Sequence, residues 1–226
     1  MIRCLVFDLD DTLYAERDYV RSGFRAAVQA LPAAVRDPVE EDCWKQFIAG
    51  TRLNIFDQVL PQHGLHDPLL IASMVARYRD HKPSIALDPT AKPVLLHAKA
   101  AGCFLGIITD GRASGQHAKI DSLGLADCVD AIICTDDLGK AFWKPHSRAF
   151  IMMAEMAKAA PHECVYVGDN PAKDFLAPNM LGWSTIMLQR DGAVHQNRAI
   201  LAGGAPQWTV KTLSETLTVL ELGPTP

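Results

Sequence analysis

The sequence has 226 residues, of which 49% are hydrophobic and 21% are charged, as is usual for a globular protein that buries a full core. The formal net charge is −4, and the 22 lysines and arginines form no basic run of the kind that follows a phosphate backbone, so we expect no nucleic-acid partner. The first apolar segment is only a few residues long and ends at Asp8, too short for a signal-peptide core or a membrane span, so we expect a cytoplasmic protein with no membrane partner.

Five short apolar runs recur along the chain, and each is followed by a polar loop. Continuous rather than alternating apolarity predicts strands that are buried on both faces, as in a parallel sheet. The runs are IRCLVF before Asp8, CFLGII before Thr109, AIIC before Thr135, CVYV before Gly168 and STIML before Gln189.

Helical patterns lie between these runs. We expect helices over residues 90–101, 114–123 and 147–160, and one short helix in the tail after Gly203. Alternation of strands and helices predicts a doubly wound, Rossmann-like α/β core with a parallel sheet, whose ligand site lies at the carboxyl ends of the strands.

The spacing between the first and second strands is much longer than a simple crossover. From Asp8 to Gly102 there are 95 residues, and their pattern is mostly helical: DYVRSGFRAAVQAL, EEDCWKQFIAG and LLIASMVARYRDH, with breaks expected at prolines such as Pro38. The sequence therefore predicts an α/β core of residues 1–14 and 88–226 and a helical insertion of residues 15–87.

Carboxylates follow two of the predicted strands. DLDDTLY brings Asp8 and Asp10 to the end of the first strand, and GDNPAKD brings Asp169 and Asp174 to the end of another. Such a cluster is costly unless it binds a cation or a proton. Hard oxygen ligands suit Mg²⁺, which keeps several waters that phosphate oxygens can replace.

Four elements in order, DLDDT, TDG, WKP and GDNPAKD, resemble the motifs of the haloacid dehalogenase-like superfamily of hydrolases. The resemblance covers the whole core, and an ordered set of motifs is far more specific than any one of them. It implies that the insertion over 15–87 is a helical cap of the C1 type. It also implies a phosphatase that hydrolyses a small phosphate monoester, a sugar phosphate or a nucleotide, through an aspartyl-phosphate intermediate.

The resemblance also implies roles for residues at the strand ends. Asp8 matches the nucleophile, Asp10 the acid/base, Thr109 the phosphate-binding residue and Lys144 the cation that stabilises the transition state. Lys140 is a rival for Lys144, but the family's lysine precedes proline. The remaining substrate contacts are expected from the amides of Asp110 and Gly111, while Arg112 is placed either to reach a substrate anion or simply to cover the surface after the turn.

The metal ligands implied by the resemblance are the Asp8 side chain, the Asp10 carbonyl and Asp169, with Mg²⁺ as the cofactor. Asp174 is expected to orient these ligands from behind.

Other activities of the same fold stay open. A sugar-phosphate mutase would use the same Asp8 and Asp10, and a non-catalytic phosphate-sensing protein would be expected to lack one of the motif residues, all of which are present. A dehalogenase would lack the carboxylate at position 10. A phosphonate hydrolase would need a cap lysine for a Schiff base, and the insertion offers Lys45 and Lys82.

Overall fold

The computed structural model describes residues 1–195 and 198–222. It divides into two compact units, Met1–Glu16 with Ala86–Pro226, called the core unit here, and Arg17–Ile85, called the helical unit. Each unit is described by itself.

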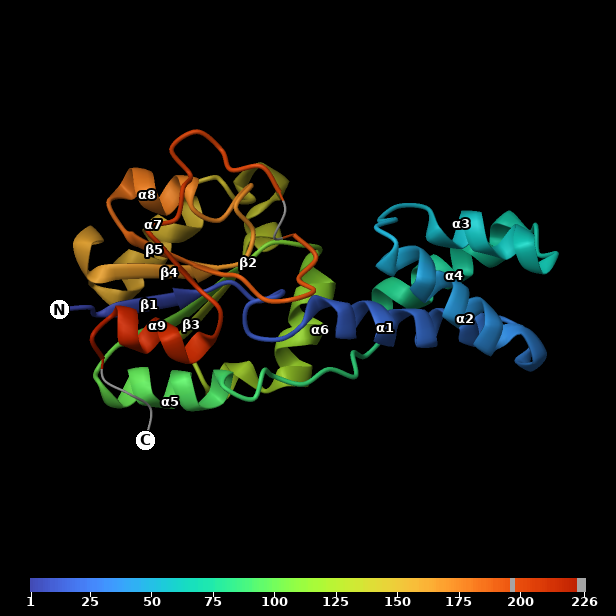
Figure 1. Ribbon diagram of the computed structural model, residues 1–226, viewed down its shortest axis with the longest axis horizontal. Coiled ribbons are helices and arrows are strands. Elements are labelled where there is room, and N and C mark those ends of the chain that lie inside the picture. The colour runs from blue at the N-terminus through green and yellow to red at the C-terminus, as the bar shows by residue number, and fades with distance from the viewer. Residues whose placement is uncertain (196–197, 223–226) are drawn as a thin grey trace. The chain divides into compact units, whose positions relative to one another are not determined.

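The core unit is built on a six-stranded sheet whose order is β3-β2-β1-β4-β5-β6, and every neighbouring pair is parallel. Figure 1 shows β1 in the interior of the sheet. The strands are β1 (Cys4–Phe7), β2 (Phe104–Thr109), β3 (Ala131–Cys134), β4 (Cys164–Gly168), β5 (Ser184–Leu188) and β6 (Trp208–Val210).

The interior strands are buried on both faces, which explains their unbroken apolar sequence. All residues of β1 and β4 are buried. The parallel sheet and its five predicted strands are confirmed. The sixth strand, β6, is missing from the sequence-based prediction because Trp208 and Thr209 are exposed and leave no apolar run to detect.

Helices cover both faces of the sheet, as a doubly wound fold requires. In Figure 1, α7 and α8 lie on one face and α5 and α9 lie together on the other. The helices of the core unit are α5 (Ala91–Ala100), α6 (Ala113–Leu123), α7 (Arg148–Ala157), α8 (Leu176–Leu181) and α9 (Leu213–Val219). Short 3₁₀ turns occur at Leu125–Asp127, Thr135–Leu138, Lys140–Phe142 and Pro161–Glu163.

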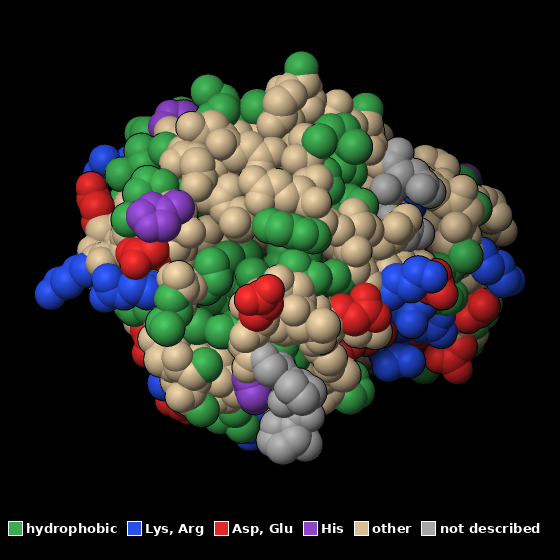
Figure 2. Space-filling model, turned by 60° about the vertical axis from the view of Figure 1, so that its left-hand side comes forward, with side chains coloured by type: hydrophobic (Ala, Val, Ile, Leu, Met, Phe, Trp, Pro, Cys, Tyr) green, Lys and Arg blue, Asp and Glu red, His purple; other side chains and the backbone are tan. Residues whose placement is uncertain are grey.

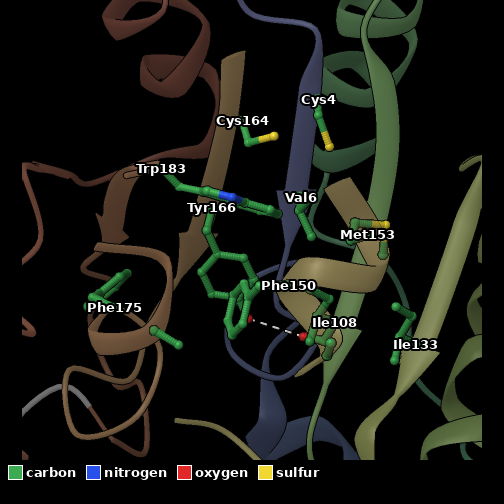
Figure 3. Close-up of a cluster of buried hydrophobic side chains, with 12 residues drawn as sticks. Cys4, Val6, Ile108, Ile133, Phe150, Met153, Cys164, Tyr166, Phe175 and Trp183 are labelled. Atoms are coloured by element: carbon green, nitrogen blue, oxygen red, sulfur yellow. Dashed lines mark hydrogen bonds between the residues drawn. The ribbon is translucent and has the colours of Figure 1, made fainter. Parts of the chain in front are cut away.

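One aromatic cluster fills the space between the sheet and α7. Phe150 meets Tyr166 edge-on at 5.0 Å and Trp183 at 5.7 Å between ring centroids (Figure 3). All three side chains are almost fully buried. This packing fixes the position of β4, which carries a functional loop at its carboxyl end.

The helical unit contains α2 (Ala33–Ile48), α3 (Ile55–Val59) and α4 (Pro68–Asp80), and all of α1 (Glu16–Ala27) except its first residue. Two 3₁₀ turns, Val28–Ala30 and Leu60–His63, belong to it. The helix break expected at Pro38 is wrong, because α2 runs through Pro38. Val39, Cys43 and Phe47 are buried at helical spacing just after it, and their burial favours continuing the helix over the local preference of proline.

No helix within the described ranges has the length and apolarity to cross a membrane. Figure 2 views the molecule from the side on which the N-terminus lies, and hydrophobic side chains gather near the middle of that face. A shallow hollow lies at the amino ends of β4 and β5, between the end of α7 and the chain that enters those strands. Its lining residues are Ile151, Ala154, Glu155, Lys158, Ala159, Pro161, Leu181 and Trp183. The hollow therefore lies at the opposite end of the sheet from the acidic loops that follow β1 and β4.

Candidate active site

The site is assembled where β2, β1 and β4 end side by side. The sheet order places β1 between the other two, so the loops that follow these three strands meet at one edge. Asp8 follows β1, Thr109 is the last residue of β2, and Asp169 follows β4. All three side chains are buried. The sequence motifs at these strand ends therefore lie together in space.

Lys144 connects two of the carboxylates. Its ammonium lies 2.6 Å from Asp8 Oδ1 and 2.7 Å from Asp174 Oδ1, and the side chains of all three residues are almost completely inaccessible to solvent. Burial opposes the charge on Lys144, but Asp174 and Asp8 outweigh it and raise the pKa of the ammonium well above its usual value. Lys144 is therefore a permanent cation within the carboxylate cluster.

Tyr166 completes the surroundings of that ammonium. The Lys144 ammonium donates to the Tyr166 hydroxyl at 2.9 Å, and the hydroxyl donates to the Ile108 carbonyl at 3.1 Å. Figure 3 shows the second of these bonds beside the aromatic cluster. A tyrosine in a fully buried strand needs such partners for its hydroxyl. The bond ties the lysine to the middle of the sheet.

Asp8, Asp169 and Asp174 form a buried group in which one carboxylate oxygen of each lies within 4.8 Å of the other two. Burial raises the pKa of Asp8 to about 7 despite the attraction of Lys144, and the negative charge of Asp174 adds to the rise. Burial, together with the charges of Asp174 and Asp8, also raises the pKa of Asp169 well above its usual value. The cluster is therefore short of positive charge.

A divalent cation would supply the positive charge that this cluster lacks. Three carboxylates face one ammonium, so two negative charges are left uncompensated when all of them are ionised. Asp169 Oδ2 is buried and has no hydrogen-bond partner among the described residues. Buried carboxylate oxygens without a donor are the ligands that a hard cation prefers.

Both carboxylate oxygens of Asp174 have a partner, unlike Oδ2 of Asp169. Its Oδ1 pairs with Lys144, and its Oδ2 accepts a hydrogen bond from the Asn170 amide at 2.8 Å. Gly168 makes room for this arrangement, since a β-carbon there would lie 2.5 Å from Asp174 Oδ2. Asp174 thus orients the lysine and shapes its own loop.

Asp10 lies apart from these three carboxylates and has its own set of donors. Lys119 pairs with Oδ1 at 2.7 Å, Gln116 donates to Oδ2 at 2.9 Å, and the Tyr14 hydroxyl donates to Oδ1. Burial opposes the charge on Asp10, but the attraction of Lys119 and these hydrogen bonds outweigh it and lower the pKa of the carboxyl. Asp10 is therefore held in one orientation as a carboxylate.

The loop after β2 is held by side chains around Asp110. Asp110 Oδ1 accepts from the Thr135 hydroxyl at 2.7 Å and from the Lys144 amide at 3.0 Å, and Oδ2 lies 3.3 Å from the Lys173 ammonium. Gly111 has φ of 135°, which disfavours any other residue. These contacts fix the loop whose amides were expected to meet the phosphoryl group.

The remaining predicted residue, Arg112, does not join the buried cluster. Its side chain is exposed just before α6, and its expected role as a substrate contact stays a prediction. Lys140, the rival of Lys144, is also exposed. Asp11 accepts hydrogen bonds from the Glu16 amide at 2.9 Å and the Val194 amide at 2.6 Å, so it supports the loop after β1.

Sequence reasoning missed several residues that contact the predicted ones, among them Tyr14, Gln116, Lys119, Tyr166 and Lys173. A signal was present for two of them. Gln116 and Lys119 are three residues apart, so they share one face of the helix that follows TDG.

Comparison with known proteins gives consistent results. The model of the haloacid dehalogenase-like hydrolases matches residues 2–182. A glyceraldehyde 3-phosphate phosphatase of Methanopyrus kandleri is 30% identical over 200 residues, covering 84% of this chain and 85% of the relative. A ribulose-1,5-bisphosphate 5-phosphatase of Halopiger xanaduensis is 26% identical over 204 residues, covering 83% and 84%.

Solved structures share the fold. The structure of a HAD family hydrolase from Deinococcus radiodurans, with bound phosphate and sodium, has a TM-score of 0.70 at 18% identity. The match covers 100% of this chain and 98% of that one.

Proposed function

Because the chain belongs to the haloacid dehalogenase-like hydrolases, we propose that it is a Mg²⁺-dependent phosphatase that hydrolyses a small phosphate monoester in two steps, through a phosphorylated Asp8. The observation that carries the proposal is the buried Lys144, paired with both Asp8 and Asp174 beside the unpartnered oxygen of Asp169. The relatives named as phosphatases of sugar phosphates support this choice of reaction and favour a phosphorylated sugar or similar small molecule as the substrate.

In the first step, a carboxylate oxygen of Asp8 attacks the phosphorus, and the bond from phosphorus to the leaving oxygen breaks. Asp10, two residues further on, enters this step with the proton that it took from water in the preceding turnover, and it gives that proton to the leaving oxygen and returns to the carboxylate form that Lys119 stabilises. The hydroxyl of Thr109 and the amides of Asp110 and Gly111 donate hydrogen bonds to the phosphoryl oxygens. The ammonium of Lys144 attracts the negative charge of the transition state and keeps Asp8 in line.

In the second step, a water molecule attacks the phosphorus of the phosphorylated Asp8. The carboxylate of Asp10 takes the proton of this water, the acyl-phosphate bond breaks, and the Asp8 carboxylate and inorganic phosphate are released. The donors around Asp10 suit this role, because they hold the carboxylate form that a base requires.

Asp8, the carbonyl of Asp10 and Asp169 would hold the metal ion, and Asp174 would orient Lys144. When bound, Mg²⁺ supplies charge that offsets the repulsion between the Asp8 carboxylate and a phosphate dianion. The residues present fit this assignment through their uncompensated negative charge.

The helical unit, within the expected insertion of residues 15–87, is proposed to act as the cap that encloses small substrates. A closed cap excludes bulk water from the phosphorylated enzyme, so that only the water positioned by Asp10 reacts.

The proposal is tested by measuring inorganic phosphate released from a series of sugar phosphates, nucleoside monophosphates and small organic phosphates, with and without Mg²⁺. We expect hydrolysis that chelation abolishes and that Asp8→Asn eliminates for every substrate. Intact-mass analysis after acid quenching should detect phosphate on the wild-type enzyme and none on Asp8→Asn. Full activity after exhaustive chelation, or in Asp8→Asn, would refute the mechanism. Transfer of phosphate to a sugar acceptor, instead of its release, would favour the mutase.

A further inference from the structure

One face of α6 carries two polar side chains that are buried although no sequence motif includes them. Gln116 and Lys119 are 3% and 6% exposed. They lie on the first helix after the TDG loop and point to the same region as Asp10 and Thr109. Burial of a lysine is costly unless its charge is matched, so this position requires an explanation.

The contacts of the two side chains connect Asp10 with Thr109. The Lys119 ammonium lies 2.7 Å from Asp10 Oδ1 and 2.7 Å from Gln116 Oε1. Gln116 Nε2 lies 2.9 Å from Asp10 Oδ2 and 2.5 Å from Thr109 Oγ1. Both oxygens of Asp10 are therefore bound by groups of α6, one by each residue.

The donors and acceptors of this set are fixed by chemistry. An ammonium can only donate, so the atom of Gln116 that faces Lys119 must be the carbonyl oxygen. The amide nitrogen of Gln116 then faces Asp10 and Thr109, and it has two protons for these two acceptors. Since the Thr109 oxygen accepts from Gln116, the proton of its own hydroxyl is directed elsewhere, as a donor to a phosphoryl oxygen needs.

Resting on the proposed function, we propose that Gln116 and Lys119 are positioning residues for both steps of the reaction. They hold the Asp10 carboxylate at the place from which it takes the proton of the attacking water, and they set the direction of the Thr109 hydroxyl. Neither residue touches the reacting atoms. The same face of one helix thus links the phosphate-binding threonine to the acid/base carboxylate.

Position matters most in the second step. The Asp10 side chain retains 17% exposure, so one edge of it stays open to a reactant. Without Lys119, the carboxylate loses its ion pair and keeps the neutral donors Gln116 and Tyr14, so its orientation is less tightly fixed. A displacement of about 1 Å at a reacting group costs on the order of 100-fold in rate.

The test uses p-nitrophenyl phosphate, whose leaving group needs little protonation, so the first step stays fast even when Asp10 is displaced. In Lys119→Met, rapid mixing should give a burst of p-nitrophenolate at nearly the wild-type rate, whereas in Gln116→Met the burst should also slow, because the Thr109 hydroxyl loses the contact that sets its direction. A steady rate roughly 10- to 100-fold below wild type should follow, because the phosphorylated enzyme accumulates. Lys99→Met removes a half-exposed lysine of α5 that lies 3.5 Å from Asp130, outside the site, and this control should behave as the wild type.

Asp10→Asn serves as the reference for complete loss of the base. A steady rate at the wild-type level in both α6 variants would overturn the inference. In Lys119→Met, a burst and a steady rate that fall together would also overturn it, because they would indicate a general disturbance of the site. If Asp10→Asn gives a burst while both α6 variants behave as the wild type, the inference is overturned and the proposed function stands. Absence of any phosphorylated enzyme in Asp10→Asn and in the α6 variants would overturn the proposed function and the inference with it.

Discussion

The hydroxyl of Tyr166 offers a stringent test of how Lys144 is held. Tyr166→Phe removes a single oxygen and keeps the ring, which packs on Phe150. The change takes one of three acceptors from the buried ammonium, whose other partners are Asp8 and Asp174. It also removes the donor to the Ile108 carbonyl. A hydrogen bond to a charged group contributes about 1.5–3 kcal/mol.

From these contacts we expect the free energy of unfolding to fall by about 2–3 kcal/mol, where the upper value includes the lost hydrogen bond to the Ile108 carbonyl. For a chain of this size the melting temperature should fall by roughly 4–12 °C, as measured by circular dichroism. Phosphatase activity should fall by about 10-fold, because the Lys144 ammonium loses one of the three acceptors that hold it in position.

A double-mutant cycle with Lys144→Met decides whether the hydroxyl acts through the lysine. If it does, Tyr166→Phe should have a much smaller effect on stability and activity in the Lys144→Met background. Equal effects in both backgrounds, or a melting temperature unchanged by Tyr166→Phe, would refute the reasoning.

Three further outcomes are expected. Asp169→Asn should raise the Mg²⁺ concentration for half-maximal activity more than about 10-fold and weaken Mg²⁺ binding in calorimetry; an unchanged Mg²⁺ titration would contradict the ligand assignment. Gly168→Ala should destabilise the core unit by about 1–3 kcal/mol and abolish most activity, because its methyl group would displace the carboxylate of Asp174; a fully active, equally stable variant would show that this carboxylate has room to move. Phosphopeptides should be hydrolysed far more slowly than small phosphate esters if the helical unit encloses the substrate, and equal turnover would rule out an enclosing cap.

Much of the fold could be predicted because strands that are buried on both faces of a parallel sheet have an unbroken apolar sequence. CVYV and CLVF are apolar at every position, since both faces of β4 and β1 are covered. The α6 helix was also predictable, because Gly124 adopts the left-handed conformation with φ of 62° that ends helices. By contrast, α3 has only five residues, too short for a periodic pattern.

Part of the candidate site was predictable because Asp8, Thr109 and Asp169 lie at the carboxyl ends of strands, and the order of the strands brings them together. Lys144 and Asp174 were predictable only from the order of the motifs. The contacts of Tyr166, Lys119 and Lys173 depend on distances between separate segments, which a single sequence does not contain. Tyr166 in particular reads as one more apolar residue of a buried strand until its hydroxyl is seen to meet Lys144.

The sheet order also has a consequence for how the protein is made. β1 is synthesised before both of its neighbours in the sheet, β2 on one side and β4 on the other, and β4 begins only at Cys164. At about 5–20 residues per second, a ribosome needs on the order of 8–31 s to go from Phe7 to Cys164. During this time one edge of β1 has no strand beside it, and Asp8 lacks Lys144. An unpaired apolar edge is a template for wrong pairing, so the nascent chain should be most prone to aggregation before residue 164 emerges. The site and the centre of the sheet are therefore completed together, late in synthesis.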